Sequence, residues 1–182
     1  MHALDNVILG CDRGAHLIEQ LLTLSRVDSL DGGVAEPCQL RSIAAEVIAA
    51  LAPSALEKGV RLELLARDEV VLPGNPALLR VLLRNLLDNS VKHTAPGTSV
   101  QVSITHEGGK ISLSVSDDGP GIPEQELEKV SQRFYRPLGT QAGGSGLGLS
   151  IVKRIAELHD ASLQIAPASE GKGLRVTVTF KS

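Results

Sequence analysis

The sequence has very few aromatic residues: no Trp, one Tyr and two Phe among 182 residues. The core must therefore be built from Leu, Ile, Val and Ala. Two cysteines, Cys11 and Cys38, do not make a disulfide framework, and we expect two reduced thiols of the kind found in cytosolic proteins. No spacing of Cys and His typical of a metal site occurs in the sequence.

Long apolar runs and a strong charge of one sign are also missing. No run approaches the ~18 residues needed to span a bilayer, and no signal peptide opens the chain. We therefore expect the chain as given to be soluble, whatever a larger parent contains. The formal net charge is −3. Because binding to a phosphate backbone needs a basic surface, we expect no nucleic-acid partner.

Apolar periodicity predicts four helices and at least five strands. A long amphipathic helix is predicted over residues 3–27, and its apolar stripe from Leu4 to Leu24 needs a partner helix. The helix opens without a capping residue, so we expect a piece cut from a longer protein. Further helices are predicted over 40–58, 76–93 and 148–159, with a bend or break at Pro53. Strands are predicted over 60–65, 69–72, 162–166 and 174–180, and as a hairpin turning at Gly108-Gly109 with Val100, Val102, Ile104, Ile111, Leu113 and Val115 facing the core. Helices packed on one side of a mixed or antiparallel sheet make an α/β two-layer sandwich.

Two asparagines within the helix predicted over residues 76–93 point to a function. Asn85 and Asn89 lie four residues apart, so they share one face. Asn is a poor residue for a helix interior, because its amide competes for backbone hydrogen bonds. An amide oxygen is a suitable ligand for magnesium, which keeps substrate phosphates in its coordination shell. A pair of solvated surface amides is the alternative interpretation.

A glycine-rich segment, Asp117-Asp118-Gly119-Pro120-Gly121, directly follows a predicted strand. Two glycines flanking one residue let the backbone approach a ligand closely. The carboxylate of Asp117, at the end of the strand, is well placed to accept a hydrogen bond from a bound amine. Asp-Gly is also an ordinary turn signal, so a simple turn is the alternative.

A second glycine-rich segment, residues 143–149, opens a helix. Backbone amides at a helix N-terminus bind phosphate when side chains do not cover them, although a flexible linker has a similar composition. The segment is neither a P-loop nor a Rossmann turn. In the preceding Arg133-Phe134-Tyr135-Arg136 we expect Phe134 to anchor the long loop to the core and one Arg to face a phosphoryl group. Residues 137–144 have the profile of a mobile lid.

In this order and spacing, these segments resemble the histidine kinase catalytic domain of the GHKL ATP-binding superfamily. Residues 85–89 are similar to its N box, 117–121 to its first glycine box, 133–136 to its F box, 144–149 to its second glycine box, and Gly171 with Gly173 to its third. The resemblance covers about residues 34–180. The stretches LLTLSRVDS and RFYRPLGTQAGGSGLGLSIVKRIAELH are similar to those of QseC-like kinases.

The resemblance implies a Bergerat-type fold, a mixed sheet with helices on one face, that binds ATP or ADP with Mg²⁺. It implies that Asn89 coordinates the metal, that Asn85 supports the same site, and that Asp117 accepts a hydrogen bond from the adenine amino group. Arg136, and with it Arg133, is expected to act in catalysis by steadying the γ-phosphate. The other nucleotide-binding residues that it implies are Lys92, His93, Gly119, Gly121, Gly144, Ser145, Gly146, Leu147 and Gly148.

The resemblance also implies a domain organisation. Residues 1–30 are similar to the second helix of the family's dimerization domain, 31–37 form a linker, and 38–182 form the catalytic ATP-binding domain, whose core we expect to be independent of the first helix. In the family, the γ-phosphoryl group passes to a histidine in an H box on the first dimerization helix, a motif that this sequence lacks, since His16 lies on the second. The implied partners are the protein's own dimerization domain within a homodimer and a response regulator receiver domain. The implied location is the cytoplasmic portion of an inner-membrane sensor kinase.

Two alternatives stay open. A GHKL ATPase of the Hsp90, gyrase or MutL type has a Glu general base in the N-box helix, whereas the corresponding residue here is Asn85, which cannot act as a base. A non-catalytic module with a degenerate pocket is the second alternative. The presence of Asn89, Asp117 and the glycines argues against a degenerate pocket. A nucleotide-binding assay distinguishes such a pocket from a working nucleotide site.

Overall fold

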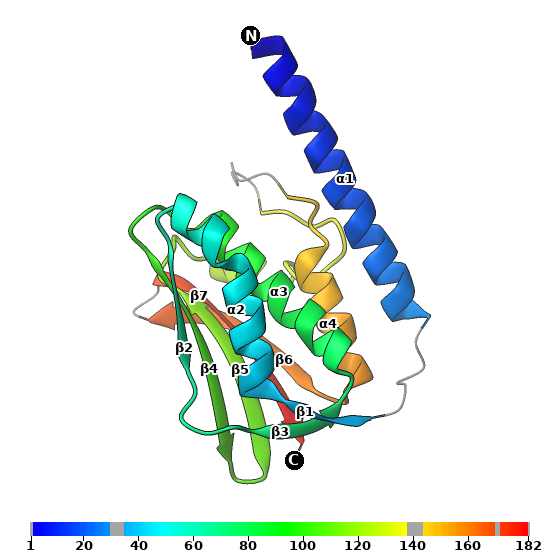
Figure 1. Cartoon of the computed structure of the whole chain (residues 1–182), viewed down its shortest axis with the longest axis vertical. Coiled ribbons are helices and arrows are strands. Elements are labelled where there is room, and N and C mark those ends of the chain that lie inside the picture. Colours follow the sequence, from blue (N-terminus) through cyan, green and yellow to red (C-terminus); the bar gives the residue numbers. More distant parts are fainter. Residues whose placement is uncertain (1, 30–34, 138–143, 170–171, 182) are drawn as a thin grey trace.

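The computed structural model describes residues 2–29, 35–137, 144–169 and 172–181. In chain order, the elements are α1 (His2–Asp28), β1 (Glu36–Gln39), α2 (Leu40–Glu57), β2 (Arg61–Leu65), β3 (Val71–Gly74), α3 (Pro76–His93), β4 (Ser99–Glu107), β5 (Lys110–Asp117), the 3-10 turn η1 (Glu124–Glu126), α4 (Gly148–Leu158), β6 (Ser162–Ser169) and β7 (Lys172–Lys181). Helices α2, α3 and α4 cover one face of the main sheet, and α1 projects beyond this layer toward the N-terminus (Figure 1). The predicted two-layer α+β sandwich is confirmed.

The main sheet has five strands in the order β2-β4-β5-β7-β6. β2 pairs parallel with β4, whereas the other neighbours pair antiparallel, so the sheet is mixed. β4 and β5 form the predicted hairpin, in which Glu107 pairs with Lys110 across the two glycines. β1 and β3 form a separate two-stranded antiparallel sheet.

Alternating side chains give the main sheet one apolar face and one polar face. Val100, Val102 and Leu113 are at most 2% exposed and belong to the same core as the leucines of α3. On the polar face, the hydroxyl groups of Ser114 and Thr177 lie 2.7 Å apart across β5 and β7. The core is aliphatic as predicted, with Phe180 the one aromatic residue among the largest fully buried side chains of the described ranges.

Helix α3 is fixed at both ends, which matters because it carries both asparagines. Pro76 occupies its first turn, and the side-chain oxygen of Asn75 accepts hydrogen bonds from two first-turn amides at 3.0 and 3.1 Å. At the other end, Lys58 Nζ donates to the carbonyl oxygens of Val91 and, at 2.6 Å, Lys92. A cation at a helix C-terminus interacts favourably with the helix dipole. Burial lowers the pKa of Lys58 from its usual value.

Of the bend or break predicted at Pro53, the break does not occur. The helix continues to Glu57. Pro53 and Ala49, whose carbonyl loses its helical partner, both lie on the exposed face and leave that carbonyl to solvent. Leu51 and Ala55 on the opposite face are buried, so packing holds the helix together across the proline.

Two boundaries near the N-terminus of α2 also differ from the prediction. The short strand expected at residues 69–72 lies at Val71–Gly74. Glu69 instead caps α2, since its carboxylate accepts hydrogen bonds from the Arg41 amide at 2.8 Å and the Ser42 hydroxyl at 2.9 Å. β1 begins at Glu36 and pairs with β3, so the end of the expected linker belongs to the folded unit. Residues 31–34 of that linker lie outside the described ranges.

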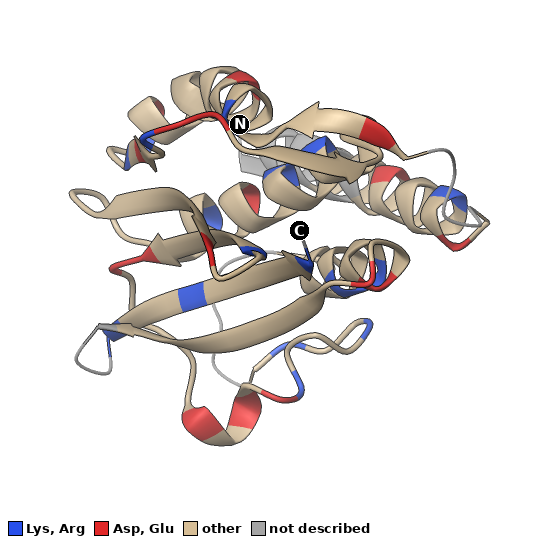
Figure 2. Ribbon diagram, turned by 90° about the horizontal axis from the view of Figure 1, so that it is seen from below, with Lys and Arg blue, Asp and Glu red and all other residues tan. Residues whose placement is uncertain are grey.

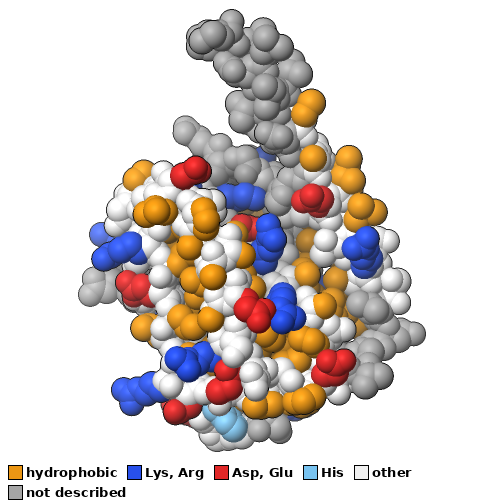
Figure 3. Space-filling view, in the orientation of Figure 1, with side chains coloured by type: hydrophobic (Ala, Val, Ile, Leu, Met, Phe, Trp, Pro, Cys, Tyr) orange, Lys and Arg blue, Asp and Glu red, His pale blue; other side chains and the backbone are white. Residues whose placement is uncertain are grey.

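Helix α1 is packed against the rest of the molecule, so the expected independence of the core from the first helix does not hold. Leu24 and Val27 are 5% and 1% exposed and join the common core, and α1 contacts α4. Leu24 therefore does not belong to an unpaired apolar stripe. Ile18, Leu21 and Leu22 remain exposed, and hydrophobic side chains are visible along this side of α1 (Figure 3).

Charged residues are not concentrated on one helix or strand of the described ranges. Acidic and basic residues are interspersed over the ribbon (Figure 2). Within the described ranges, none of the helices combines the length and the apolar character that crossing a bilayer requires.

Candidate functional site

A cavity of about 320 Å³ opens between α3, the end of β5, the loop that follows β5 and the start of α4. Eleven of the predicted site residues line it: Asn85, Asn89, Lys92, His93, Asp117, Gly121, Arg136, Gly144, Ser145, Gly146 and Gly148. The fold thus brings together residues of four motifs that are spread over residues 85–148 of the sequence.

Asp117 is the buried carboxylate of this cavity, with 8% of the residue exposed. Its Oδ1 accepts hydrogen bonds from the amides of Gly119 at 3.1 Å and Leu174 at 3.2 Å. Its Oδ2 accepts one from the Ser90 hydroxyl at 3.1 Å. Burial raises the pKa of Asp117 above its usual value; the three hydrogen bonds act against this rise, and the negative charge of Asp118 adds to it. These bonds fix the orientation of an acceptor at the wall of the cavity.

The predicted face of α3 forms one wall. Asn85 Nδ2 donates to the Val81 carbonyl at 2.8 Å, and its Oδ1 points to the start of α4 at Gly148. Asn89 lies one turn further along the same face and also lines the cavity. His93 follows at the end of the helix. Burial lowers the pKa of His93, and the nearby cations Lys58, Lys92 and Arg136 lower it further, which favours the neutral imidazole.

Two glycines are required by close backbone contacts around the cavity. Gly146 has φ +72°, and a Cβ there would lie 2.8 Å from the carbonyl carbon of Phe134. Gly173, from the expected third glycine box, has φ +72°, and a Cβ would lie 1.8 Å from the Asp117 carbonyl oxygen. An L side chain is disfavoured at both positions by conformation and by space. The glycine at 173 therefore sets how closely β7 approaches Asp117.

Three predicted site residues do not line the cavity. Gly119 lies behind Asp117 and donates to its carboxylate. Leu147 is fully buried in the core. Arg133 points toward α1, where its Nη2 lies 2.9 Å from Asp28 Oδ2. Proximity to a glycine-rich motif in the sequence did not determine the direction of the Leu147 and Arg133 side chains.

Phe134 does not anchor the loop, contrary to the sequence prediction. It is 61% exposed and has φ +63°. The loop is held instead by Val130, which is 6% exposed, and by Tyr135, which packs against the core and donates a hydrogen bond to Glu126. That hydrogen bond raises the pKa of the Tyr135 phenol. Of residues 137–144, the expected lid, 138–143 lie outside the described ranges.

Sequence reasoning missed ten lining residues: Gln20, Asp88, Pro120, Ile122, Pro123, Val130, Tyr135, Pro137, Leu149 and Leu174. Several are apolar or proline and give the cavity a wall suited to a flat ring. Pro120 lies inside the first glycine box and Leu149 at the end of the second, so the motifs themselves could have indicated them. Gln20 and Leu174 reach the cavity from α1 and β7, and no local signal marks them.

The cavity wall offers a metal ion the amide of Asn89 rather than an acidic cluster. In the part of the chain that the structure describes, no group of three or more His, Cys, Asp or Glu residues is arranged to hold a metal ion. An amide ligand such as Asn89 suits a magnesium ion that takes most of its other ligands from phosphate and water.

Comparison with known proteins identifies the class of the domain. Residues 74–182 match the family described as histidine kinase-, DNA gyrase B-, and HSP90-like ATPase. The chain belongs to this family.

Several named proteins that are similar to this chain are sensor kinases. The sensor protein QseC of Salmonella typhimurium is 42% identical over 181 residues, which are 98% of this chain and 39% of the relative. The chain thus spans about two fifths of that relative's length. The cytoplasmic segment of a histidine kinase QseC has a TM-score of 0.63 at 28% identity, with 93% of each chain covered. A mycobacterial sensor histidine kinase, MprB, has a TM-score of 0.72 at 28% identity, covering 81% of this chain and 97% of that one. The predicted fold and the predicted likeness to QseC-type kinases are confirmed.

Proposed function

We propose that the cavity binds ATP or ADP with Mg²⁺ and that the chain transfers the γ-phosphoryl group of ATP to a histidine on a dimerization domain. One observation carries this proposal: a single cavity is lined by the buried Asp117 carboxylate, by Asn89 on α3 and by the glycine-rich start of α4. The carboxylate is a hydrogen-bond acceptor for adenine, the amide oxygen is a ligand for magnesium, and the helix N-terminus binds phosphate.

The adenine end of the site is assigned to Asp117. Its carboxylate accepts a hydrogen bond from the exocyclic amino group of adenine, and such charge-assisted bonds are stronger than neutral ones. Guanine carries an oxygen at that position, which would face the carboxylate without a proton between them. Ile122, Leu149 and Leu174 provide apolar surface for the flat base.

The phosphate end is assigned to α3 and the start of α4. Asn89 supplies an amide oxygen for Mg²⁺, and Asn85, held by its hydrogen bond to Val81, borders the same space. Lys92 and Arg136 place positive charge on the cavity wall, where Arg136 steadies the γ-phosphate. Magnesium bound there neutralises phosphate charge during transfer.

Asn85 favours phosphoryl transfer over hydrolysis by this site. Hydrolysis requires a base to activate water, and the Asn85 amide donates its proton to a backbone carbonyl at 2.8 Å. An amide has no basic lone pair for this role. The ATP-driven clamp ATPases of the family are therefore a poorer fit.

The two histidines that directly precede an acidic residue, as in an H box, are unsuited to receive the phosphoryl group. His106 precedes Glu107, but it lies on strand β4 rather than on a helix. His159 precedes Asp160, but its Nε2 accepts a hydrogen bond from the Asn75 amide at 3.1 Å and its Nδ1 lies 2.8 Å from the Ile155 carbonyl oxygen. We therefore place the acceptor histidine on a dimerization domain of a homodimeric sensor kinase. A response regulator is the next acceptor, and the cytoplasmic side of the membrane is the location.

The test is phosphoryl transfer in trans. The chain is incubated with γ-labelled ATP and Mg²⁺, alone and with a separately produced dimerization domain of a QseC-type kinase that carries its histidine. We expect acid-labile label on the added domain and none on the chain itself, and no label with Asn89→Ala. Label on a histidine of this chain incubated alone, or an unlabelled acceptor despite bound ATP, would refute the proposed transfer.

A further inference from the structure

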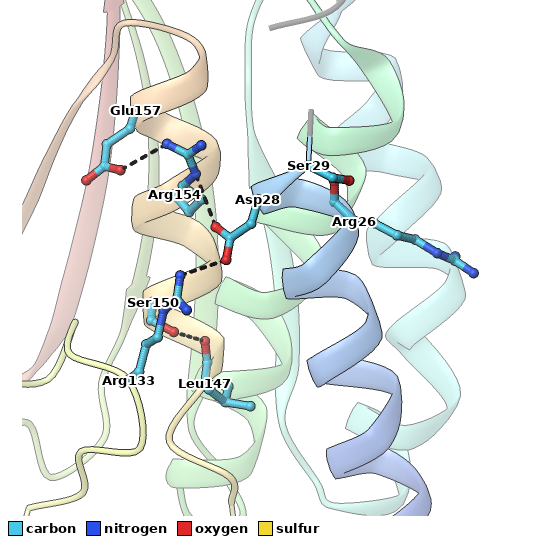
Figure 4. A network of polar contacts seen from close by, with 8 residues as sticks. All are labelled: Arg26, Asp28, Ser29, Arg133, Leu147, Ser150, Arg154 and Glu157. Atoms are coloured by element: carbon cyan, nitrogen blue, oxygen red, sulfur yellow. Dashed lines mark hydrogen bonds and ion pairs between the residues drawn. The ribbon is translucent and has the colours of Figure 1, made fainter. Parts of the chain in front are cut away.

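The carboxylate of Asp28, at the end of α1, joins three parts of the molecule. Its Oδ2 lies 2.9 Å from Arg133 Nη2, and its Oδ1 lies 3.3 Å from Arg154 Nε on α4 (Figure 4). Arg154 also pairs with Glu157 at 3.7 Å. Arg133 lies two residues before the segment that contributes Tyr135, Arg136 and Pro137 to the cavity wall, so this wall is fastened to α1.

A second polar contact from α1 reaches another part of the cavity wall. Gln20 lies eight residues before Asp28, which places both on the same face of the helix. Gln20 Oε1 accepts a hydrogen bond from the Ser145 hydroxyl, and Ser145 Oγ accepts one from the Leu147 amide at 3.1 Å. Gln20 also lines the cavity itself. The glycine-rich wall at the start of α4 is therefore fastened to α1 as well.

Apolar packing holds α1 in this position. Leu24 lies between Gln20 and Asp28 in the sequence, and Val27 is next to Asp28; both are at most 5% exposed. Leu17 packs against the same core. The two walls are also joined to each other, because the Phe134 amide donates to the Gly146 carbonyl at 3.0 Å. One face of α1 thus contacts both walls at the places where they meet.

We propose that Gln20 and Asp28 are positioning residues for the nucleotide cavity, and that docking of α1 against α4 is coupled to nucleotide binding. The nucleotide part of this inference rests on the proposed function. Walls that α1 has already ordered lose less conformational freedom when a ligand binds, so the docked chain binds nucleotide more tightly. Because such coupling is reciprocal, bound nucleotide stabilises the docked helix by the same factor.

The test uses the 182-residue chain and its Asp28→Asn variant, which removes the charge with little change in shape. Glu46→Gln is the matched control, since it removes a comparably exposed ion pair, Glu46 with Arg80 at 2.9 Å, on the far side of α3. Hydrogen exchange at the amides of Phe134 and Leu147 is measured without nucleotide. From two partly exposed ion pairs we expect about two- to ten-fold faster exchange in Asp28→Asn, and parental rates in Glu46→Gln.

The second readout is the affinity for Mg-ADP, which we expect to weaken by a similar factor in Asp28→Asn. Mg-ADP should also slow exchange of the α1 amides from residue 17 to residue 28 in the parent chain. The double variant Asp28→Asn/Arg133→Gln should be no weaker than Asp28→Asn alone, because Arg133 acts through Asp28.

Each outcome decides a separate point. Unchanged exchange at Phe134 and Leu147 in Asp28→Asn would overturn the positioning role. Faster exchange together with an unchanged or tighter Mg-ADP affinity would overturn the coupling. A parent chain that fails to bind Mg-ADP would refute the proposed function, while the exchange rates would still decide whether α1 positions the walls.

Discussion

Replacing Asp117 with Asn should separate nucleotide binding from folding. The variant keeps the shape of the side chain and keeps Oδ1 as an acceptor for the amides of Gly119 and Leu174. The new NH₂ group replaces Oδ2, and the Ser90 hydroxyl can accept from it instead of donating to it. The same NH₂ group would face the adenine amino group as a second donor, so no hydrogen bond forms there.

The expected loss follows from the kind of bond that disappears. A hydrogen bond to a charged partner contributes about 1.5–3 kcal/mol, which corresponds to roughly 10- to 150-fold weaker binding. Calorimetric titration with Mg-ATP and Mg-GTP measures both affinity and base preference. We expect the preference of Asp117→Asn for ATP over GTP to fall together with its ATP affinity. A folded variant that binds Mg-ATP as tightly as the parent would refute the adenine contact.

The pH dependence of stability gives an independent check on the same residue. Burial raises the pKa of Asp117 above 3.8, so the folded chain holds this proton more tightly than the unfolded chain. The protonated carboxyl therefore contributes stability below pH 3.8, and this contribution is lost as the pH rises through the raised pKa. The Asn variant lacks this loss. As the pH rises from 3.8 through the raised pKa of Asp117, the free energy of unfolding of the Asn variant should increase relative to that of the parent. At higher pH the difference should stay constant, as measured by urea denaturation.

Three further substitutions test the packing around the site. Gly173→Ala should destabilise the chain by about 1–3 kcal/mol in urea denaturation, because its Cβ would lie 1.8 Å from the Asp117 carbonyl oxygen; an unchanged midpoint would contradict the close approach. Pro53→Ala should raise the free energy of unfolding by about 1–3 kcal/mol, since the exposed Ala49 carbonyl regains its helical partner; a loss of stability would show that the proline is required. Lys58→Met should lower the free energy of unfolding by about 1 kcal/mol, because the last carbonyls of α3 lose their cation. Equal stability of the variant and the parent would argue against this cap.

Most helices and strands could be predicted from the sequence because apolar periodicity, prolines and glycines within each segment determine them. Helix α3 was predicted over residues 76–93 and is found there, since Pro76 marks its first turn and leucines repeat along one face. The hairpin of β4 and β5 was predicted from alternation and two glycines. Boundaries failed where a distant side chain intervened, as Glu69 does by capping α2 across the chain.

The site was predicted only as far as the motifs reach. Asn85, Asn89 and Asp117 line the cavity because each lies on an element whose register the sequence determines. The direction of Arg133 was not predictable, since its partner Asp28 is 105 residues away. The role of Gln20 was equally hidden, because its contact with Ser145 spans 125 residues and depends on how α1 docks.

The central claim is that this cavity binds adenine nucleotide through magnesium held by Asn89, and one titration tests it most directly. Mg-ATP is titrated into the parent chain and into Asn89→Ala by calorimetry, with Mg²⁺ and with the metal chelated. We predict binding by the parent that weakens strongly on chelation, and weak binding by Asn89→Ala that chelation no longer changes. Equal Mg-ATP affinity in the two chains, or parent binding that is indifferent to the metal, would contradict the account.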